Sequence, residues 1–402
     1  MVNNIKISKF WLVLIISQLS MIGPFTVDTY LPSFPSIENE FQISRALLNQ
    51  SLGFYLVAFG VSTLIWGSIA DRFGRKFVIV WGSIFFSIAS LGCGLAENFN
   101  QFLIFRIAQG FFASGGMVAG RAIVRDLYNS KDSQKVMSQV IMFFALAPAV
   151  APILGGWLHD AFGWRSVFYF LVGYSLISML IFIILVPETL AKEHRQSLHP
   201  KKLWILYSAT FKNMKFQAST FAIGSAFGGL FLYIAGAPTV VFDFLGLGAD
   251  DFGWQFIPMV SGLILGSFIS SKLSHQLTAL QLTFIATMTL LVSLLLNFVQ
   301  WQFFEPGVFV VVFPLVILAM GIGLFLPAMT VIGLDCFPKN RGTASAIQGF
   351  IQTGFNAIIA SLILPLLGAS LLNFVIMQAV FWLMTALLWW YLHNREKIAL
   401  NR

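Results

Sequence analysis

The stretch Gly67-Ser-Ile-Ala-Asp71-Arg72-Phe-Gly74-Arg75-Lys76 carries four charges and is flanked by two long apolar runs, Leu47 to Ala70 and Phe77 to Leu95. A helix of roughly 20 apolar residues, rising about 1.5 Å per residue, crosses the hydrocarbon core of a bilayer. Each run is long enough to do so. Because charge is costly inside lipid, the loop between the runs is predicted to lie at the water face of a membrane.

The composition of the whole chain is that of a polytopic membrane protein. Of its 402 residues, 58% are hydrophobic and only 10% are charged, whereas a soluble domain usually has about 25% charged residues. The first apolar run, Phe10 to Leu31, is longer than a signal-peptide core and lacks an Ala-x-Ala-like cleavage site, so we interpret it as a span. Cys93 and Cys336 lie far apart and indicate neither a disulfide framework nor a metal site.

Twelve apolar segments are predicted to cross the membrane as helices, so the fold class is all-α. They cover, to within a few residues, 9–31, 46–70, 77–95, 99–121, 135–158, 165–187, 217–241, 252–272, 278–298, 307–333, 342–367 and 371–392. The one long connection, residues 188–216, is basic and central. It divides the chain into an N-terminal six-helix half, residues 1–187, and a C-terminal six-helix half, residues 217–402.

The distribution of Lys and Arg predicts the orientation in the membrane. If both termini are cytoplasmic, all of the 24 basic residues except Arg45, Arg106 and Arg165 fall on the inner side. The outer loops are acidic instead. The net charge of +8 therefore indicates the inner face of a membrane and not a nucleic-acid partner.

Two ionisable residues within spans are candidates for chemistry. Asp28, in span 1, is the only acidic residue that we place inside a span, and Arg106 lies in span 4. Intramembrane ionisable groups are functional candidates by default. The helical spacing places Gln109 and Gly110 on the same face as Arg106. The alternatives are a helix-end aspartate in interfacial water and a structural arginine bonded to backbone carbonyls.

Span 5 contains two prolines followed by two glycines. Pro148 and Pro152 lie four residues apart on one face and weaken the backbone hydrogen bonding twice. Gly155 and Gly156 allow close contact between helices. The alternative is an ordinary kinked packing helix.

The wall of a transport path is less clearly marked in the sequence. A polar stripe recurs every four residues in span 11, and several aromatic or apolar residues are candidates for lining. The stripe is Gln348, Gln352 and Asn356, and the lining candidates are Tyr30, Tyr55, Phe59, Met142, Phe143, Phe231 and Tyr233. For any single aromatic residue, packing or contact with lipid is the better explanation of its presence.

Several functions have no support in the sequence. The five histidines lie in loops or at span ends, so no metal site is predicted. There is no Gly-x-x-x-x-Gly-Lys-Ser/Thr loop for ATP and no nucleophile–base pair for an enzyme. We therefore expect no cofactor. The second half lacks a counterpart to the Asp-Arg pair of the loop at 67–76, since the stretch Gly266 to His275 keeps the glycine and has only Lys272.

The order Gly-x-x-x-Asp-Arg-x-Gly-Arg-Lys resembles the signature loop of the major facilitator superfamily at every motif position. The motif residues are Gly67, Asp71, Arg72, Gly74 and Arg75. The resemblance implies that Asp126 pairs with Arg75, and that Asp71 faces the positive N-terminal end of span 11, near Gly342 to Ala344. Surface ion pairs contribute only about 0–1 kcal/mol, so this cluster is expected to bias a gating equilibrium. A stop signal that only sets topology would explain the basic residues but not Asp71 or the glycines.

Two further motifs resemble those of proton-coupled members of the superfamily. Arg106-x-x-Gln109-Gly110 is similar to the span-4 motif that is linked to proton coupling. The span-5 segment resembles the antiport motif Gly-Pro-x-x-Gly-Gly, with Ala151 in place of the glycine before Pro152. Because Asp28 is the only acidic residue within a span and Arg106 the only basic one well inside, we expect Asp28 to alternate between proton and substrate, while Arg106 organises the polar network that tunes it.

Taken together, several stretches look like the Bcr/CflA group of bacterial drug:proton antiporters. They are Val27 to Pro35, the signature loop, Gly120 to Asp126, Gly163 to Arg165 and Pro187 to Leu190. The resemblance implies a monomeric, multi-pass exporter in the bacterial inner membrane, with antibiotic resistance as its consequence. Its partners would be protons, lipid and drug-like or amphiphilic small molecules, moved along a path between the two halves. The alternatives are an exporter of a metabolite or siderophore, a nutrient:proton symporter and a sensor that does not transport.

The predicted topology can be tested at Lys201 in the central connection. We expect a cysteine at position 201 to resist an impermeant thiol reagent added outside intact cells, because the basic residues place this segment inside. Ready labelling from outside would contradict the predicted orientation.

Overall fold

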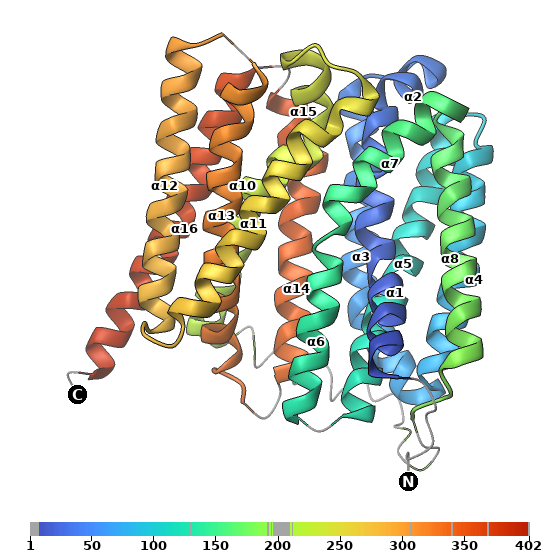
Figure 1. Ribbon diagram of the computed structural model, residues 1–402, viewed down its shortest axis with the longest axis horizontal. Coiled ribbons are helices and arrows are strands. Elements are labelled where there is room, and N and C mark those ends of the chain that lie inside the picture. The colour runs from blue at the N-terminus through green and yellow to red at the C-terminus, as the bar shows by residue number, and fades with distance from the viewer. Residues whose placement is uncertain are drawn as a thin grey trace. The chain divides into compact units, whose positions relative to one another are not determined.

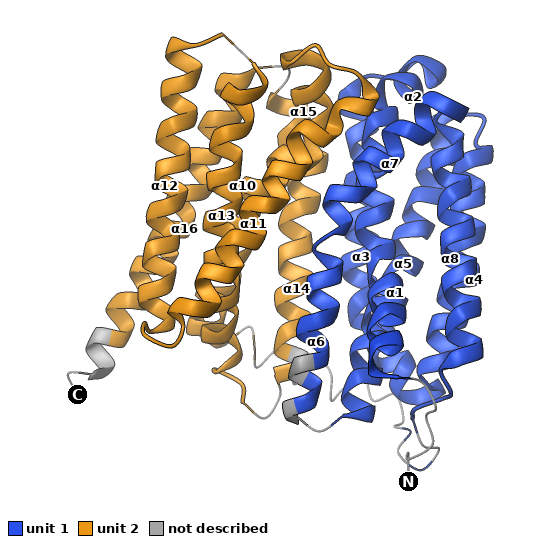
Figure 2. Cartoon of the chain, viewed as in Figure 1, with its two compact units in different colours: residues 1–199 blue, residues 200–402 orange. Residues whose placement is uncertain are grey.

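The computed structural model describes residues 8–128, 130–190, 193, 195, 210, 212–305, 307–338, 341–367 and 370–400. The chain forms two compact units, residues 1–199 and residues 200–402, both built from helices (Figure 2). Most of the predicted linker lies outside the described residues, and so does Lys201.

Twelve helical segments within the described residues are long and apolar enough to cross a membrane. They are Lys9–Phe41, Arg45–Phe73, Arg75–Leu95, Phe99–Leu127, Val136–Phe162, Arg165–Leu185, Met214–Ala235, Ala249–Leu273, Ala279–Phe303, Val308–Leu334, Ala344–Leu367 and Leu371–Glu396. The predicted all-α fold with twelve spans is confirmed.

Unit 1 contains the first six of these spans (Figure 1). Its helices are α1 (Lys9–Asp28), η1 (Leu31–Ser33), α2 (Phe34–Phe41), α3 (Arg45–Phe73), α4 (Arg75–Leu95), α5 (Phe99–Leu127), α6 (Ser130–Phe144), α7 (Ala147–Phe162) and α8 (Arg165–Leu185). One face of α4 carries the exposed aromatic residues Phe77, Trp81 and Phe85. Because they are spaced four residues apart, they form one apolar ridge, which suits contact with lipid tails.

The first span differs from its prediction. It was expected to end near residue 31, but α1 ends at Asp28 and the chain continues through η1 and α2 as far as Phe41. Pro32 lies within the 3-10 turn η1. Proline has no N–H to donate and its ring disturbs the preceding turn, so the α-helical pattern does not run through this point. Asp28 therefore lies at a break in the helix.

The fifth span is also broken. α6 ends at Phe144, two turn residues follow, and α7 begins at Ala147 with Pro148 in its first turn. Figure 1 shows the change of direction between α6 and α7. Since Pro148 has no N–H to donate to the carbonyl of Phe144, four residues earlier, the break agrees with the predicted weakening of the backbone by proline.

Unit 2 contains the other six spans and two π-helical segments. Its elements are α10 (Met214–Ala235), η3 (Thr239–Phe244), η4 (Ala249–Phe252), α11 (Gly253–Leu273), α12 (Ala279–Phe303), α13 (Val308–Leu334), α14 (Arg341–Ile358), η5 (Ile359–Ile363), α15 (Leu364–Leu367) and α16 (Leu371–Leu400). The π segments η3 and η5 lie beside Pro238 and Pro365. Proline disturbs regular helical bonding, and these segments were not among the predicted elements.

Candidate functional site

Arg106 of α5 is completely buried inside unit 1. Its guanidinium carbon lies 4.5 Å from the ring centre of Tyr30 and 4.6 Å from that of Tyr55. Nη1 donates a hydrogen bond to Oε1 of Gln109 at 2.6 Å and another to the carbonyl of Thr26 at 3.4 Å. Aromatic faces and amide oxygens thus replace water around this cation. Among the described residues, no carboxylate forms an ion pair with it.

The amide of Gln109 extends this network from α5 to α4. Its Nε2 donates to Oγ of Ser90 at 2.8 Å, and Ser90 donates in turn to the carbonyl of Phe86 at 2.8 Å. Nε and Nη2 of Arg106 have no hydrogen-bond partner among the described residues. Arg106 is therefore held on one side and keeps unused donors on the other.

The two tyrosines that enclose Arg106 are themselves held by hydrogen bonds. The hydroxyl of Tyr30 lies 2.8 Å from Oγ of Ser51, and the hydroxyl of Tyr55 donates to the carbonyl of Gly23 at 3.3 Å. A Cβ at Gly110 would overlap the carbonyl of Tyr55, so α5 and α3 approach closely at this point. The sequence suggested both tyrosines as path lining, and the structure places them against Arg106.

Asp28 is the only buried carboxyl group among the described residues. It is the last residue of α1, and only 3% of its surface is exposed. No hydrogen bond or ion pair joins its carboxyl group to another described residue, and Arg106 does not pair with it. A carboxylate removed from water is costly unless it is paired, so Asp28 is suited to taking up a proton or a cation.

The span-5 motif packs directly against the break that follows Asp28. A Cβ at Gly155 of α7 would overlap the carbonyl oxygen of Thr29, the next residue after Asp28. Pro152, Gly155 and the neighbouring Gly156 are all buried. The glycine therefore permits a backbone contact that any larger residue would disrupt, and it brings the motif next to the candidate proton site.

Two charges of the signature loop, on Asp71 and Arg75, form a cluster with Asp126 where three helices end or begin. Nε of Arg75 donates to Oδ2 of Asp126 at 2.9 Å, and its Nη1 donates to Oδ1 of Asp71 at 2.6 Å. The side chain of Arg75 is 4% exposed, that of Asp126 is 17% exposed and that of Asp71 is 42% exposed. Arg75 thus bridges α3 and α5. The predicted approach of Asp71 to span 11 involves the other unit and stays a prediction.

The other residues of the signature loop have simpler surroundings. Arg72 is exposed and lies over the ring of Phe73 at 5.3 Å. Gly67 faces α5, since a Cβ there would lie 3.8 Å from a methyl group of Val118. Gly74 separates α3 from α4 with φ of 108°, a conformation that side chains strongly disfavour.

Two residues of this cluster were missed as site residues in the sequence. Glu188 accepts hydrogen bonds from the backbone N–H groups of Arg75 and Lys76, both at 3.0 Å. Oγ1 of Thr189 donates to Oδ2 of Asp126 at 3.2 Å. In the sequence, these two residues stand out only because Pro187 to Leu190 resembles the family. Nothing in the local spacing links residue 188 to residue 75.

The remaining lining candidates of unit 1 lie in different environments. Phe59 is half-buried and lies 6.1 Å from the ring of Tyr55. Met142 is 61% exposed, and Phe143 is half-buried. The structure brings Phe59 close to the Arg106 network, and none of its described contacts joins Met142 or Phe143 to that network.

The lining candidates of unit 2 are largely buried. Phe231, Tyr233, Gln348 and Asn356 are each less than 9% exposed, and Gln352 is half-buried. Nε2 of Gln348 and Oδ1 of Asn356 have no hydrogen-bond partner among the described residues. The polar stripe of α14 therefore offers one donor and one acceptor that remain unused.

The hydroxyl of Tyr233 belongs to a buried amide cluster that the sequence analysis did not identify. Nδ2 of Asn297 donates to Oε1 of Gln378 at 2.6 Å and to the hydroxyl of Tyr233 at 3.1 Å. Nε2 of Gln378 reaches Oγ of Ser293 at 3.2 Å, and Gln255 binds the carbonyl of Tyr233 at 2.7 Å. The sequence pattern that could have indicated this cluster is the presence of isolated amide residues, such as Asn297 and Gln378, within apolar spans.

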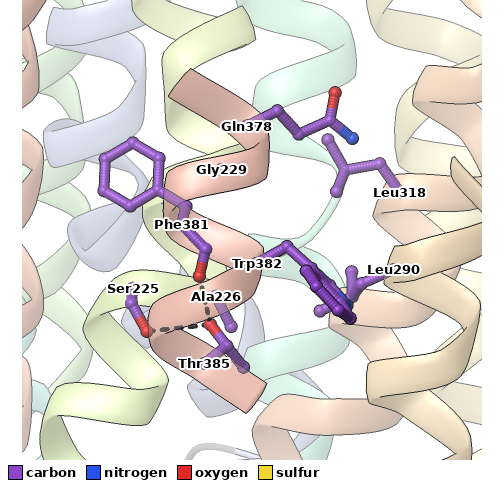
Figure 3. Close-up of a pocket in the computed structure, with 9 residues that line it drawn as sticks. All are labelled: Ser225, Ala226, Gly229, Leu290, Leu318, Gln378, Phe381, Trp382 and Thr385. Carbon is purple, nitrogen blue, oxygen red and sulfur yellow. Dashed lines mark hydrogen bonds between the residues drawn. The ribbon is translucent and has the colours of Figure 1, made fainter. Parts of the chain in front are cut away.

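A small cavity adjoins this cluster. The centre of a water molecule can occupy about 10 Å³ of it, which is room for about one water. Figure 3 shows Gln378 at one side of it, and Ser225 hydrogen-bonded to Thr385 at the other. None of the buried side chains described in unit 2 is charged. Among the described residues, the buried charged side chains thus all lie in unit 1.

Comparisons with known proteins agree with the predicted resemblance. A family model described as Major Facilitator Superfamily matches residues 14–360. The chain is 29% identical over 374 residues to a bicyclomycin resistance protein homolog of Haemophilus influenzae, with 90% of each chain covered. It is 25% identical over 386 residues to multidrug resistance protein D of Escherichia coli, with 96% of each covered.

The fold is similar to that of solved transporters. A bacterial homolog of the human lysosomal transporter Spinster, inward-facing and occupied, matches with a TM-score of 0.75, 17% identity and 96% of each chain covered. A D-xylose-proton symporter matches with a TM-score of 0.69 and 17% identity over 94% of this chain and 97% of its own. At such identities the likeness concerns the fold alone.

The ion cluster predicts different outcomes for its central arginine, Arg75, and for its more exposed carboxylate, Asp71. Arg75→Ala should lower the free energy of unfolding by about 1–3 kcal/mol, because it leaves the partly buried Asp126 without its cation. Asp71→Asn should cost only about 0–1 kcal/mol, because Asp71 is well exposed. Both should impair transport if the cluster biases the gate. Unfolding in detergent and transport in membrane vesicles measure the two effects, and normal transport by both variants would exclude a gating role.

The contact between α7 and the break in α1 predicts that Gly155→Ala is damaging. The added methyl group meets backbone atoms that cannot rotate away, so we expect a loss of about 1–3 kcal/mol in stability together with a loss of transport. Gly173→Ala in α8 is the matched control, since a Cβ there meets nothing within 4 Å. Equal unfolding midpoints for the two variants would contradict this packing.

Proposed function

Because this chain belongs to the major facilitator superfamily, we propose that it exports drug-like or amphiphilic small molecules by alternating access, in exchange for protons. The observation that carries the proposal is the state of Asp28, a buried carboxyl group without a partner among the described residues, at a break in the first span. The resistance proteins among its relatives support the substrate class. We also place the protein in a bacterial inner membrane, with both termini in the cytoplasm.

Asp28 is the proposed site at which proton and substrate compete. When the path opens outward, a proton that binds Asp28 removes the negative charge and favours release of a cationic substrate. When the path opens inward, loss of that proton restores an anion that can bind the next substrate. The exchange requires competition, because a ligand shifts an equilibrium only through its different affinity for the two states.

Arg106 is proposed to tune this site without pairing with it. Tyr30, Tyr55 and Gln109 hold its guanidinium in place, so its positive charge stays at a fixed position inside unit 1. A fixed cation in a medium of low dielectric acts over a longer distance than it would in water. We propose that this charge makes the negative form of Asp28 less costly.

The cluster of Arg75 with Asp71 and Asp126 is proposed to act as a latch at the inner face. Its ion pairs lie within unit 1, and its outermost carboxylate, on Asp71, remains well exposed. An exposed pair contributes little to the fold. A small contribution is nevertheless enough to bias two conformations of nearly equal free energy.

A second candidate function is export of a metabolite or siderophore by the same mechanism. It differs from drug efflux only in substrate, and Asp28 serves both. A nutrient:proton symporter is the third, and the fold does not separate it, since a D-xylose-proton symporter has the same architecture. The contact of Gly155 with Thr29 favours exchange over symport, because it ties the predicted antiport motif to Asp28. Efflux measured over a panel of compounds separates the three.

Asp28→Asn should abolish efflux of cationic compounds driven by a pH gradient. The direct measurement is proton release when substrate is added to the detergent-purified protein in weakly buffered solution. We expect release from the wild type and none from Asp28→Asn, because a side-chain amide does not ionise and has no proton to release when substrate binds. Asp160→Asn, at an exposed position of the same unit, is the control and should release protons normally. Release that persists in Asp28→Asn would place the exchanging proton elsewhere.

A further inference from the structure

The carboxylate of Glu188 caps a helix that begins far away in the sequence. Glu188 follows the end of α8, yet its Oε1 accepts from the N–H of Arg75 at 3.0 Å across 113 residues of sequence. Its Oε2 accepts from the N–H of Lys76 at 3.0 Å. Oε1 also accepts from the N–H of Leu190 at 3.0 Å, which holds the carboxylate in place. One side chain thus joins the exit of α8 to the first turn of α4.

This cap supplies what the sequence around α4 lacks. The first N–H groups of a helix have no partner within the helix, and they form the positive end of its dipole. A Ser, Thr, Asp or Asn at the N-cap usually accepts from them, but here the N-cap residue is Gly74 and has no side chain. The ionised Glu188 takes this role, with the stronger bonds that a charged acceptor forms.

The position of Glu188 also explains why the loop has glycine at position 74. A Cβ at Gly74 would overlap Oε2 of Glu188 and lie 2.8 Å from its carboxyl carbon. The positive φ of 108° favours glycine here, and the missing side chain leaves room for the carboxylate beside it. Part of the signature motif is thus shaped by a residue that lies outside it.

The residue after Glu188 acts on the other side of the same cluster. Oγ1 of Thr189 donates to Oδ2 of Asp126 at 3.2 Å, the oxygen that also accepts from Nε of Arg75. Nζ of Lys76 donates to the carbonyl of Ile183, near the end of α8, at 2.9 Å. The segment that leaves α8 therefore contacts both partners of the Arg75–Asp126 pair.

We propose that Glu188 is a positioning residue of the inner latch. It holds the first turn of α4 so that Arg75 bridges Asp71 and Asp126, and it makes the start of the connection between the two units part of that latch. The proposal deepens the gating role proposed above and rests on it. It differs from simple capping in one respect, because a cap alone would stabilise α4 equally well without the side chain of Arg75.

A double-mutant cycle separates the two roles. The four proteins are the wild type, Glu188→Gln, Arg75→Ala and the double variant, purified in detergent and unfolded by heat. If Glu188 positions Arg75, the drop in unfolding midpoint caused by Glu188→Gln should be at least about twofold smaller in the Arg75→Ala background, because the effects of contacting residues do not add. Equal drops in both backgrounds would reduce Glu188 to a cap and overturn the proposal.

The matched control is Glu193→Gln, the same substitution at an exposed position a few residues further along, which should leave the midpoint unchanged in both backgrounds. If Glu188→Gln cannot be purified, Glu188→Asp enters the same cycle, since it keeps the charge on a shorter side chain. Hydrogen exchange adds a local readout, and Glu188→Gln should speed exchange at the amides of Arg75 and Lys76. Unchanged exchange at these amides would also overturn the proposal.

The unfolding cycle needs no substrate, so it remains informative if none of the compounds tested is exported. In membrane vesicles in which the wild type exports a tested compound, Glu188→Gln should reduce the maximal rate of export. In the Arg75→Ala background it should cause no further reduction. Normal transport by Glu188→Gln would overturn the positioning role while leaving proton-coupled export intact.

Discussion

The cost of removing charge from water governs the arrangement of this protein. Only three charged residues are buried among those described, and each meets that cost differently. Arg75 lies between two carboxylates. Arg106 lies between two aromatic faces and binds amide oxygens. Asp28 has neither kind of partner. A group with a complete set of partners stabilises one arrangement, whereas a group without them is ready to bind a ligand.

Tight backbone contacts place the charged groups relative to one another within unit 1. Gly155 lets α7 approach the carbonyl of Thr29, next to Asp28. Gly110 lets α5 approach the carbonyl of Tyr55, whose ring contacts Arg106. Gly74 leaves room for the carboxylate of Glu188. In each case a segment distant in sequence occupies the space that a Cβ would need. Glycines within the motifs therefore indicate where a segment outside the motif packs closely against the backbone.

The two units differ in the kind of polar chemistry that they bury. Unit 1 contains all three of the buried charged residues described, while the buried polar residues described in unit 2 are neutral. The cluster of Tyr233, Asn297 and Gln378 satisfies itself by hydrogen bonds among uncharged groups. Neutral networks of this kind hold helices together without responding to protons. The absence of an Asp-Arg pair after span 8 in the sequence points to the same asymmetry.

The sequence by itself determined the fold class, the number of spans and the family. These properties depend on the length of apolar runs and on a short motif, both of which are local in the chain. It also identified Asp28, Arg106 and the signature loop as candidates, since ionisable groups stand out in apolar surroundings. Their roles in transport stay proposals.

Only the tertiary structure decided which groups meet. Contacts across many residues of sequence produce three features: the approach of Gly155 to the carbonyl of Thr29, the sandwich of Arg106 between Tyr30 and Tyr55, and the cap that Glu188 provides. Periodicity describes which residues share a face of one helix, but not which helix that face meets. For that reason Glu188, whose neighbours in sequence carry no sign of α4, became a candidate only when the helices were packed together.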